Sequence, residues 1–329
     1  MESPEFDQFA RERAGATTRR TVARSLAAIL GVVGLGSGLA MTSEADSNKK
    51  KKRRQRKKKK KYECGTKNKI CATPTSPCQT ITCESHKCVM SNVTDGTSCG
   101  GGRTCSSGTC ECPAGKTCDV TVSPSDMNLW FGYNDENDEK DDGLLSFVDG
   151  PGNPPYGDGS VQMTVSGTQR RNVATYQFTG TKLSDISQLK FTTYNASATN
   201  DAGPDASGYL HFNVDFNGSD TWQRRLVFVP STNGTVKADK WQEWDAIGNG
   251  SGKWLLSGGV WPVDDLPNTT AKTWEDILDQ YPQVRIRVTD AFLGIRVGEP
   301  YADGFTGNVG SVTFGTDAGV SRFVFGPDA

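Results

Sequence analysis

The cysteines are confined to one short part of this 329-residue chain, and this confinement constrains the fold more than any other feature. An even number of cysteines within one short segment is typical of a disulfide framework, which stabilises a segment too small to bury its own core. A zinc site is the alternative, but it favours C-x2-C pairs with histidine support, whereas this segment has no such pair and only His86. We therefore predict disulfides and an oxidising compartment. The predicted disulfide cysteines are Cys64, Cys71, Cys78, Cys83, Cys88, Cys99, Cys105, Cys110, Cys112 and Cys118.

The N-terminus carries the pattern of an export signal. Residues 17–24 (TTRRTVAR) are basic and precede an apolar stretch at residues 25–41 that is short for a spanning helix. The pair Arg19-Arg20, followed by two apolar residues and Arg24, resembles the twin-arginine export signal. The resemblance implies a signal peptide at residues 1–45 and the twin-arginine export machinery as a partner. An uncleaved signal anchor is the alternative.

A strongly basic run follows this signal. Residues 49–61 read KKKKRRQRKKKKK, with twelve basic side chains in thirteen positions. Like charges repel one another, so we predict that residues 46–62 are disordered. A nuclear role conflicts with the export signal, and a stop-transfer role would leave the cysteines inside the cell. Outside the cell, the run would tether the protein to polyanions such as cell-wall polymers, anionic lipid surfaces or extracellular DNA. A solvated spacer is the other interpretation.

Charge divides the chain into three parts. Residues 1–61 hold 17 Lys/Arg and 6 Asp/Glu, a net charge of +11, whereas residues 119–329 hold 15 and 28, a net charge of −13. The acidic C-terminal part is a poor match for nucleic acid, which is itself negative. After the signal and the basic segment, the predicted organisation is a cysteine-rich disulfide module at residues 63–118, an acidic linker at 119–142 and a domain at 143–329.

Two parts of the cysteine-rich module are similar to known modules. CECPAGKTC at residues 110–118 is similar to the end of an EGF-like module. DGTSCGGGRTCSSGTC at residues 95–110 looks like disintegrin-associated cysteine-rich regions and short repeats of bacterial surface proteins. Both resemblances imply a secreted spacer or adhesion module and no catalytic chemistry.

The C-terminal domain reads as many short strands. Apolar or alternating segments such as SVQMTVS (160–166) and GYLHFNVDFN (208–217) are separated by Gly, Asn, Asp and Pro. Their frequency and turn composition predict an all-β fold, a C-terminal jelly-roll β-sandwich. One short helix is predicted at residues 271–282, where Thr273 caps the start and Asp276 completes a capping box.

The strand at residues 209–216 supplies most of the candidate ligand residues. Its even-numbered residues are apolar and should face the core, so the odd-numbered residues should share the opposite face. That face would carry an aromatic ring and hydrogen-bonding groups, which suit a sugar ligand; an ordinary solvated face is the other interpretation. Two arginines near residue 286 alternate in the same way. The candidate ligand-binding residues are Tyr209, His211, Asn213, Asp215, Trp241, Glu243, Arg285 and Arg287.

The segment KWQEWDA at residues 240–246 adds a ring and two carboxylates. On an alternating strand, Trp241, Glu243 and Asp245 share one face and Trp244 takes the other. Paired carboxylates also raise the glycosidase alternative. Sandwich glucanases, by resemblance, need a third carboxylate on that strand, where this chain has Ile247.

Five segments carry a resemblance to a larger group: FVDGP (147–151), YGDGSVQMTV (156–165), KWQEWDA (240–246), TWEDIL (273–278) and GFTGNVGSVTFGT (304–316). Together they resemble secreted bacterial jelly-roll domains related in shape to carbohydrate-binding modules and concanavalin-like sandwiches. The resemblance implies a sandwich that binds a carbohydrate. Many such domains end with a strand whose aspartate supports calcium, and this chain has VGSV (309–312) at that place.

Calcium is the one cofactor that the sequence raises. The segment NDENDEKDDG (134–143) is rich in carboxylates, which are hard oxygen ligands, although it does not meet the EF-hand spacing. A solvated acidic linker is the other interpretation. The candidate ligands of a structural calcium ion are Asp135, Asp138, Asp141, Asp142 and Asp303.

These patterns predict a secreted or cell-surface, non-catalytic protein whose sandwich binds an extracellular glycan or a surface partner. The first alternative is a polysaccharide-active hydrolase or lyase that uses carboxylates such as Glu243. The second is a structural coat protein without a small ligand. The C-terminal domain has one histidine, His211, and no cysteine, so neither a Cys nucleophile nor a multi-histidine metal centre is predicted there.

Overall fold

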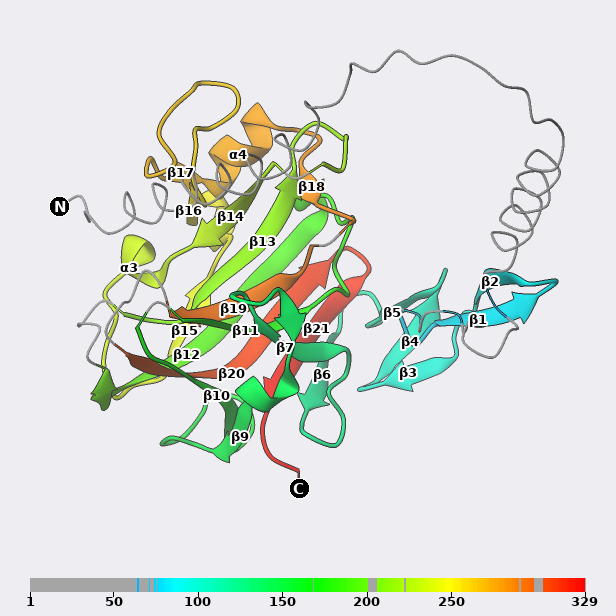
Figure 1. Cartoon of the computed structure of the whole chain (residues 1–329), viewed down its shortest axis with the longest axis horizontal. Coiled ribbons are helices and arrows are strands. Elements are labelled where there is room, and N and C mark those ends of the chain that lie inside the picture. The colour runs from blue at the N-terminus through cyan, green and yellow to red at the C-terminus, as the bar shows by residue number, and fades with distance from the viewer. Residues whose placement is uncertain are drawn as a thin grey trace, which may run out of the picture.

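The structure is a computed structural model that describes residues 64, 71, 74, 76–167, 169–200, 206–221, 223–289, 291–298 and 304–328. The predicted signal peptide, the predicted basic segment and the calcium candidate Asp303 lie outside the described residues. Within them, strands dominate and helices are short (Figure 1), so the predicted all-β sandwich is confirmed. No described helix has the length and apolar character needed to cross a bilayer.

Two mainly antiparallel sheets form the sandwich. The first, called the β20 sheet, has the described order β15 (Gln242–Asp245), β12 (Ile186–Asn200), β20 (Phe305–Thr316), β10 (Gly159–Val165) and β9 (Ser146–Asp149), and β20 also pairs with β21 (Gly319–Phe325). The second, called the β13 sheet, has the order β17 (Lys272–Thr273), β16 (Lys253–Leu256), β14 (Arg224–Phe228), β13 (Tyr209–Asp215), β19 (Leu293–Gly298), β11 (Arg170–Thr175), β7 (Trp130–Asn134) and β8 (Glu139–Lys140), with β18 (Arg285–Ile286) beside β13.

The core lies between the two sheets and follows the alternation of their strands. Leu210, Phe212 and Val214 of β13 are fully buried, and so are Val309 and Val312 of β20. Burial of apolar side chains from both inner faces supplies the main favourable term for folding. The prediction that the even-numbered residues of the β13 strand face the core is therefore confirmed.

The short elements between strands are mostly single turns: η1 (Asp142–Leu144), η2 (Leu183–Asp185), α3 (Pro230–Asn233), η3 (Gly248–Gly250) and α4 (Trp274–Gln280). The predicted helix is α4. Thr273 accepts a hydrogen bond from the backbone N–H of Asp276, whose side chain accepts from the Thr273 backbone N–H, so the predicted capping box is present. Trp274 and Ile277 bury the inner face of the helix.

The expectation of an acidic linker at residues 119–142 is wrong. Strand β6 (Thr117–Val122) begins inside the cysteine-rich module and pairs in parallel with β21 of the sandwich. Strands β7 and β8 then join the β13 sheet. The sequence TCDVTV alternates apolar and polar residues and buries Val120 and Val122, a strand signal that the acidic composition downstream obscures.

All ten cysteines form disulfides, and this excludes the zinc alternative. The pairs are Cys64–Cys83, Cys71–Cys88, Cys78–Cys105, Cys99–Cys110 and Cys112–Cys118. They hold two small sheets, one of β1 (Gln79–Glu84) and β2 (Lys87–Asn92), the other of β3 (Ser98–Gly100), β4 (Arg103–Ser106) and β5 (Thr109–Glu111).

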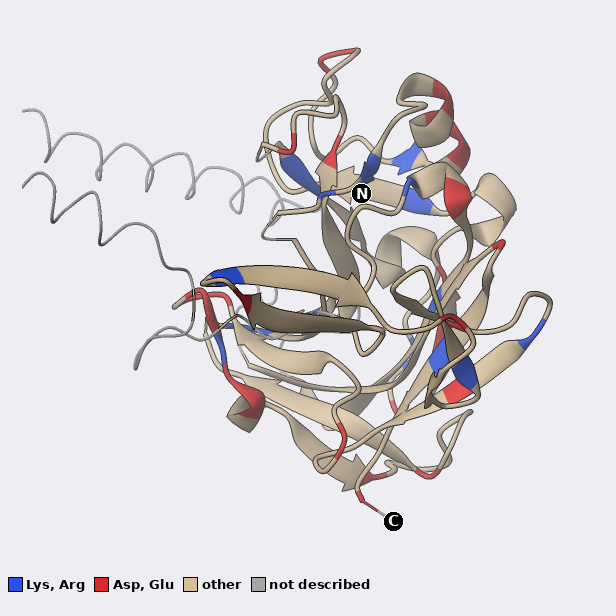
Figure 2. Ribbon diagram, turned by 90° about the vertical axis from the view of Figure 1, so that its right-hand side faces the viewer, with Lys and Arg blue, Asp and Glu red and all other residues tan. Residues whose placement is uncertain are grey.

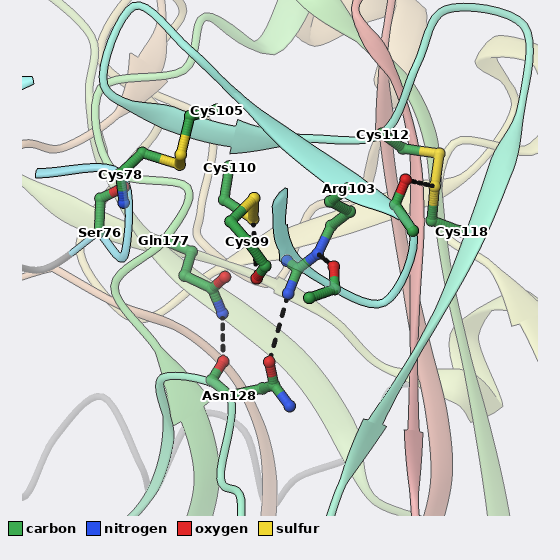
Figure 3. The surroundings of a disulfide bond; sticks show 12 residues. Ser76, Cys78, Cys99, Arg103, Cys105, Cys110, Cys112, Cys118, Asn128 and Gln177 are labelled. Carbon is green, nitrogen blue, oxygen red and sulfur yellow. Dashed lines mark hydrogen bonds between the residues drawn. A yellow bond between two sulfur atoms is a disulfide. The ribbon is translucent and has the colours of Figure 1, made fainter. Parts of the chain in front are cut away.

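The cysteine-rich module packs against the sandwich through Arg103 and the start of β6. Arg103 is buried, lies over the ring of Phe323 with its Cζ 5.4 Å from the centroid, and donates a hydrogen bond to Asn128 Oδ1 (Figure 3). Burial lowers the pKa of its guanidinium, and Asp126 partly offsets that effect. Gly319 of β21 lies so close to Cys112 that a Cβ would be 2.0 Å from the Cys112 carbonyl oxygen. The module therefore contacts the sandwich directly through Arg103, Cys112 and the pairing of β6 with β21.

Candidate functional site

The predicted ligand residues fall into two separate groups. Tyr209, His211, Asn213 and Asp215 lie on the outer face of the β13 sheet, as the alternation predicts. Trp241 and Glu243 lie on the outer face of the β20 sheet, on the opposite side of the core. The sandwich interior separates the two groups, so the structure does not bring the predicted residues together in one site.

The β13 group is buried, which corrects the expectation of an open face. The exposed fraction is 1% for His211 and 0% for Asp215. His211 Nε2 lies 2.8 Å from Asn172 Oδ1, and Arg225 donates to Asn213 Oδ1 over 2.9 Å. These side chains hydrogen-bond with one another, which offsets part of the cost of burying polar groups. The row on β13 is a buried hydrogen-bonded layer.

The two predicted arginines bind aspartate residues near this layer. Arg285 donates to Asp215 Oδ2 from both Nε (3.0 Å) and Nη2 (2.8 Å). Arg287 donates to the backbone oxygen of Asp220, and its Nε lies 3.7 Å from Asp220 Oδ1. Both arginines therefore fix the chain between β13 and β14, which corrects the expectation that they line an open ligand face.

The described calcium candidates have other partners. Asp135 is buried and lies within 3.4 Å of the guanidinium groups of Arg225 and Arg296. Asp141 accepts from the Gly143 backbone, and Asp142 from the Gly132 backbone. Among the described residues, no three of these carboxylates have oxygens close enough to share a metal ion. This donor set does not fit calcium, and binding that involves Asp303 stays a prediction.

The β20 sheet presents the more accessible group, at the pairing of β12 with β15. The register places Lys190 opposite Asp245 and Thr192 opposite Glu243. Lys190 Nζ lies 3.5 Å from Asp245 and 3.8 Å from Glu243. The side chains of Lys190, Glu243 and Asp245 are 33%, 36% and 42% exposed, so they remain open to a ligand.

Two rings extend this group along the same strands. The ring centroids of Trp241 and Tyr194 lie 5.5 Å apart at an angle of 50°. Trp241 Nε1 donates to the backbone oxygen of Pro151 over 2.7 Å, which fixes the indole. A Cβ on Gly310 would lie 3.0 Å from the indole Cζ3, so the absence of a side chain at this glycine lets the ring lie against β20. The ring is half-buried and held in place.

The loop between β9 and β10 supplies a third ring. Tyr156 donates from its hydroxyl to Glu243 Oε2 over 2.7 Å, and Arg322 lies over its ring, with Cζ 3.9 Å from the centroid. Arg322 in turn donates to both oxygens of Asp119. The hydrogen bond to Glu243, together with partial burial, raises the pKa of Tyr156, so it is a hydrogen-bond donor at neutral pH.

We call this group the Trp241 platform; its residues are Tyr156, Lys190, Tyr194, Trp241, Glu243 and Asp245. It combines an indole and two phenol rings with one cation and two carboxylates. Rings of this kind pack against the C–H faces of a sugar, and the charged groups make strong hydrogen bonds to hydroxyls. Sequence reasoning found Trp241 and the carboxylates. It missed Lys190 and Tyr194, although both alternate with Phe191 along β12.

Electrostatics agree with an uncharged or polar ligand. Acidic segments in Figure 2 lie on loops and helical turns around the sandwich, with basic segments between them. Residues 119–329, which include the sandwich, carry a net charge of −13, and this charge disfavours binding of nucleic acid, which is itself negative.

Comparisons with known proteins give a distant likeness only. No family model and no curated protein matches the chain. One solved structure, described by the promiscuous specificity of carbohydrate-binding modules from the β-sandwich superfamily, is 12% identical with a TM-score of 0.30, over 72% of this chain and 66% of that one. Another, TmCBM61 in complex with β-1,4-galactotriose, is 10% identical with a TM-score of 0.23, over 59% of this chain and 88% of that one. At these scores the likeness carries no argument about function.

Proposed function

We propose that this protein is an extracellular, non-catalytic binding protein whose sandwich binds a glycan chain on the Trp241 platform. The observation that carries the proposal is the fixed indole of Trp241, which lies against Gly310 beside the partly exposed Lys190 and the exposed carboxylates of Glu243 and Asp245. A ring held in one orientation loses little freedom on binding, and exposed charged groups nearby meet the ligand's hydroxyls. The five disulfides support the extracellular placement, since such bonds persist in oxidising compartments.

The test is a panel of extracellular and cell-wall polysaccharides, each measured for both binding and turnover with the oxidised full chain. We expect saturable binding to at least one polysaccharide and no release of reducing ends. Turnover that disappears in Glu243→Gln would replace our proposal with the hydrolase or lyase alternative. Binding to nothing on the panel, by a chain whose disulfides are intact, would favour a structural coat protein.

The basic run at residues 49–61 extends the proposal to attachment. We propose that it tethers the exported protein to a polyanionic wall polymer or an anionic lipid surface. Exposed charges are screened as the Debye length falls from about 10 Å at 0.1 M salt to about 3 Å at 1 M. Retention on anionic vesicles or isolated walls should therefore drop as salt rises.

The control for this experiment is a chain in which the twelve basic residues of 49–61 are replaced by Gln, which keeps the length. We expect this variant to be released at low salt while it still binds the glycan. Equal retention of the variant and the natural chain would show that the run is only a spacer.

A further inference from the structure

A cavity lies between the cysteine-rich module and the sandwich, and none of its lining residues belongs to the Trp241 platform. It has a volume of about 310 Å³. Gln79 and Glu111 line it from the module, and Gln177, Thr181 and Ser321 line it from the sandwich. The volume lies at the lower end of the range of about 300–1,000 Å³ that small-molecule sites occupy.

The walls of this cavity are fixed by cross-links and packing. On the module side, the disulfides Cys78–Cys105 and Cys99–Cys110 brace the strands that carry Arg103 and Glu111 (Figure 3). On the sandwich side, the rings of Phe178 and Phe314 stack with centroids 3.8 Å apart. A fixed wall reduces the entropic cost of binding a ligand.

Several polar groups of the lining have no hydrogen-bonding partner within the described residues. Gln177 uses its Nε2 for the Asn128 backbone oxygen and Thr175 Oγ1, and its Oε1 accepts nothing there. Among the described residues, the side chains of Gln79, Glu111, Thr181 and Ser321 likewise make no hydrogen bond. Together they offer both donors and acceptors.

The apolar and charged parts of the lining restrict the ligand further. Tyr176, Phe178 and Phe323 give ring surface. Arg103 and Glu111 are opposite charges, so the lining favours no net charge on its occupant. Rings with surrounding hydroxyl, amide and carboxylate groups match a compact molecule that carries several hydroxyls on an apolar ring.

We propose that this cavity binds a neutral sugar unit, which would contact the cysteine-rich module and the sandwich at once. This site shares no residue with the Trp241 platform, so sugar binding in the cavity can be tested independently of the proposed glycan binding on the platform. The cysteine-rich module would then contribute one wall of a ligand site as well as connecting the sandwich to the N-terminal part of the chain.

The experiment mixes the oxidised full chain with glucose, galactose, mannose, xylose or glucuronic acid. Thermal shift and saturation-transfer NMR measure the binding of each sugar. We expect one neutral sugar to raise the melting temperature saturably, because a ligand that binds only the folded state stabilises it. Thr181→Val should weaken the binding about five-fold, the loss of roughly one hydrogen bond of about 1 kcal/mol. Glu111→Gln keeps an acceptor but removes its charge, so it should weaken the binding in the same direction.

The matched control is Thr80→Val, the same chemical change at an exposed position of β1 outside the cavity, which should leave the affinity unchanged. Methyl glycosides tested beside the free sugars identify whether the occupant is a chain end or a free monosaccharide; binding of either supports the proposal. It is overturned if no sugar binds, if glucuronic acid binds as well as the neutral sugars, or if Thr181→Val and Glu111→Gln bind as the natural chain does.

Discussion

Replacement of Trp241 by alanine is expected to weaken glycan binding about 30-fold, the equivalent of about 2 kcal/mol for a central tryptophan in a binding site. The indole is the largest ring of the platform, and its N–H is already committed to Pro151, so the ring face is what remains for a ligand. Affinity is measured by calorimetry with the polysaccharide that the panel identifies. The melting temperature of the variant establishes that it is folded.

Two further variants test whether the glycan binds at the Trp241 platform. Gly310→Ala keeps the indole but forces it away from β20, because the new Cβ would lie 3.0 Å from Cζ3, and it should weaken binding in the same direction. Tyr133→Ala removes a half-buried ring from the outer face of the other sheet and serves as the matched control. If Tyr133→Ala abolishes binding and Trp241→Ala does not, the ligand binds on the β13 sheet and our proposed platform is wrong.

Replacement of Asp215 by alanine should lower the free energy of unfolding by about 3 kcal/mol, at the lower end of the cost of breaking a buried ion pair. We take the lower end because Arg285 is 32% exposed and partly solvated, whereas Asp215 is fully buried. The carboxylate also accepts from Gln223 and from the backbone of Gly218. The variant would remove the acceptor that these donors share, although Gln223 Nε2 would keep Asn217 Oδ1 and Arg285 Nη2 would keep the Gly218 backbone oxygen.

The effect of Asp215 should depend on pH in a defined direction. Burial alone would raise its pKa, but hydrogen bonds from Arg285, Gln223 and the backbone outweigh that effect and hold the pKa below the ordinary value of 3.8. A carboxyl whose pKa is lower in the folded state stabilises the protein fully when the pH lies above its pKa in the unfolded state. This contribution is lost as the pH falls through its pKa in the folded state. The difference in the free energy of unfolding between the natural chain and Asp215→Ala should therefore be constant from pH 5 to 7, about one to three units above the ordinary pKa. The difference should shrink in acid.

Chemical denaturation at several pH values measures this difference. Asp317→Ala, an exposed aspartate in the turn between β20 and β21, is the control and should change stability by less than about 0.5 kcal/mol at any pH. A difference for Asp215→Ala that grows below pH 4, the ordinary range for a carboxyl, would contradict the assigned direction of its pKa.

Alternation in the sequence predicted which side of β13 faces the core, because successive side chains of a strand point to opposite faces. It did not predict that Asn172, Arg225 and Arg285 would bury the other side, since these partners lie far away in the chain. A local pattern gives the direction of a side chain but carries no information about what covers it. In a similar way, the acidic composition of residues 134–142 concealed strand β8, and β7 (Trp130–Asn134) directly before it was also missed.

The platform illustrates the same limit. Local alternation within residues 240–246 was enough to predict that Trp241, Glu243 and Asp245 share one face. Tyr156 comes from a Pro- and Gly-rich loop without periodicity, and only the return of that loop over the β20 sheet brings its hydroxyl to Glu243.

The sequence by itself determined the all-β class, the use of all ten cysteines in disulfides and the capping box of α4, because each depends on spacing within a short segment or on the number of cysteines. The tertiary structure alone decided the disulfide pairing, the docking of the cysteine-rich module through Arg103 and the separation of the predicted ligand residues onto two sheets. These depend on contacts between distant segments, which form only when the two sheets close over a common core.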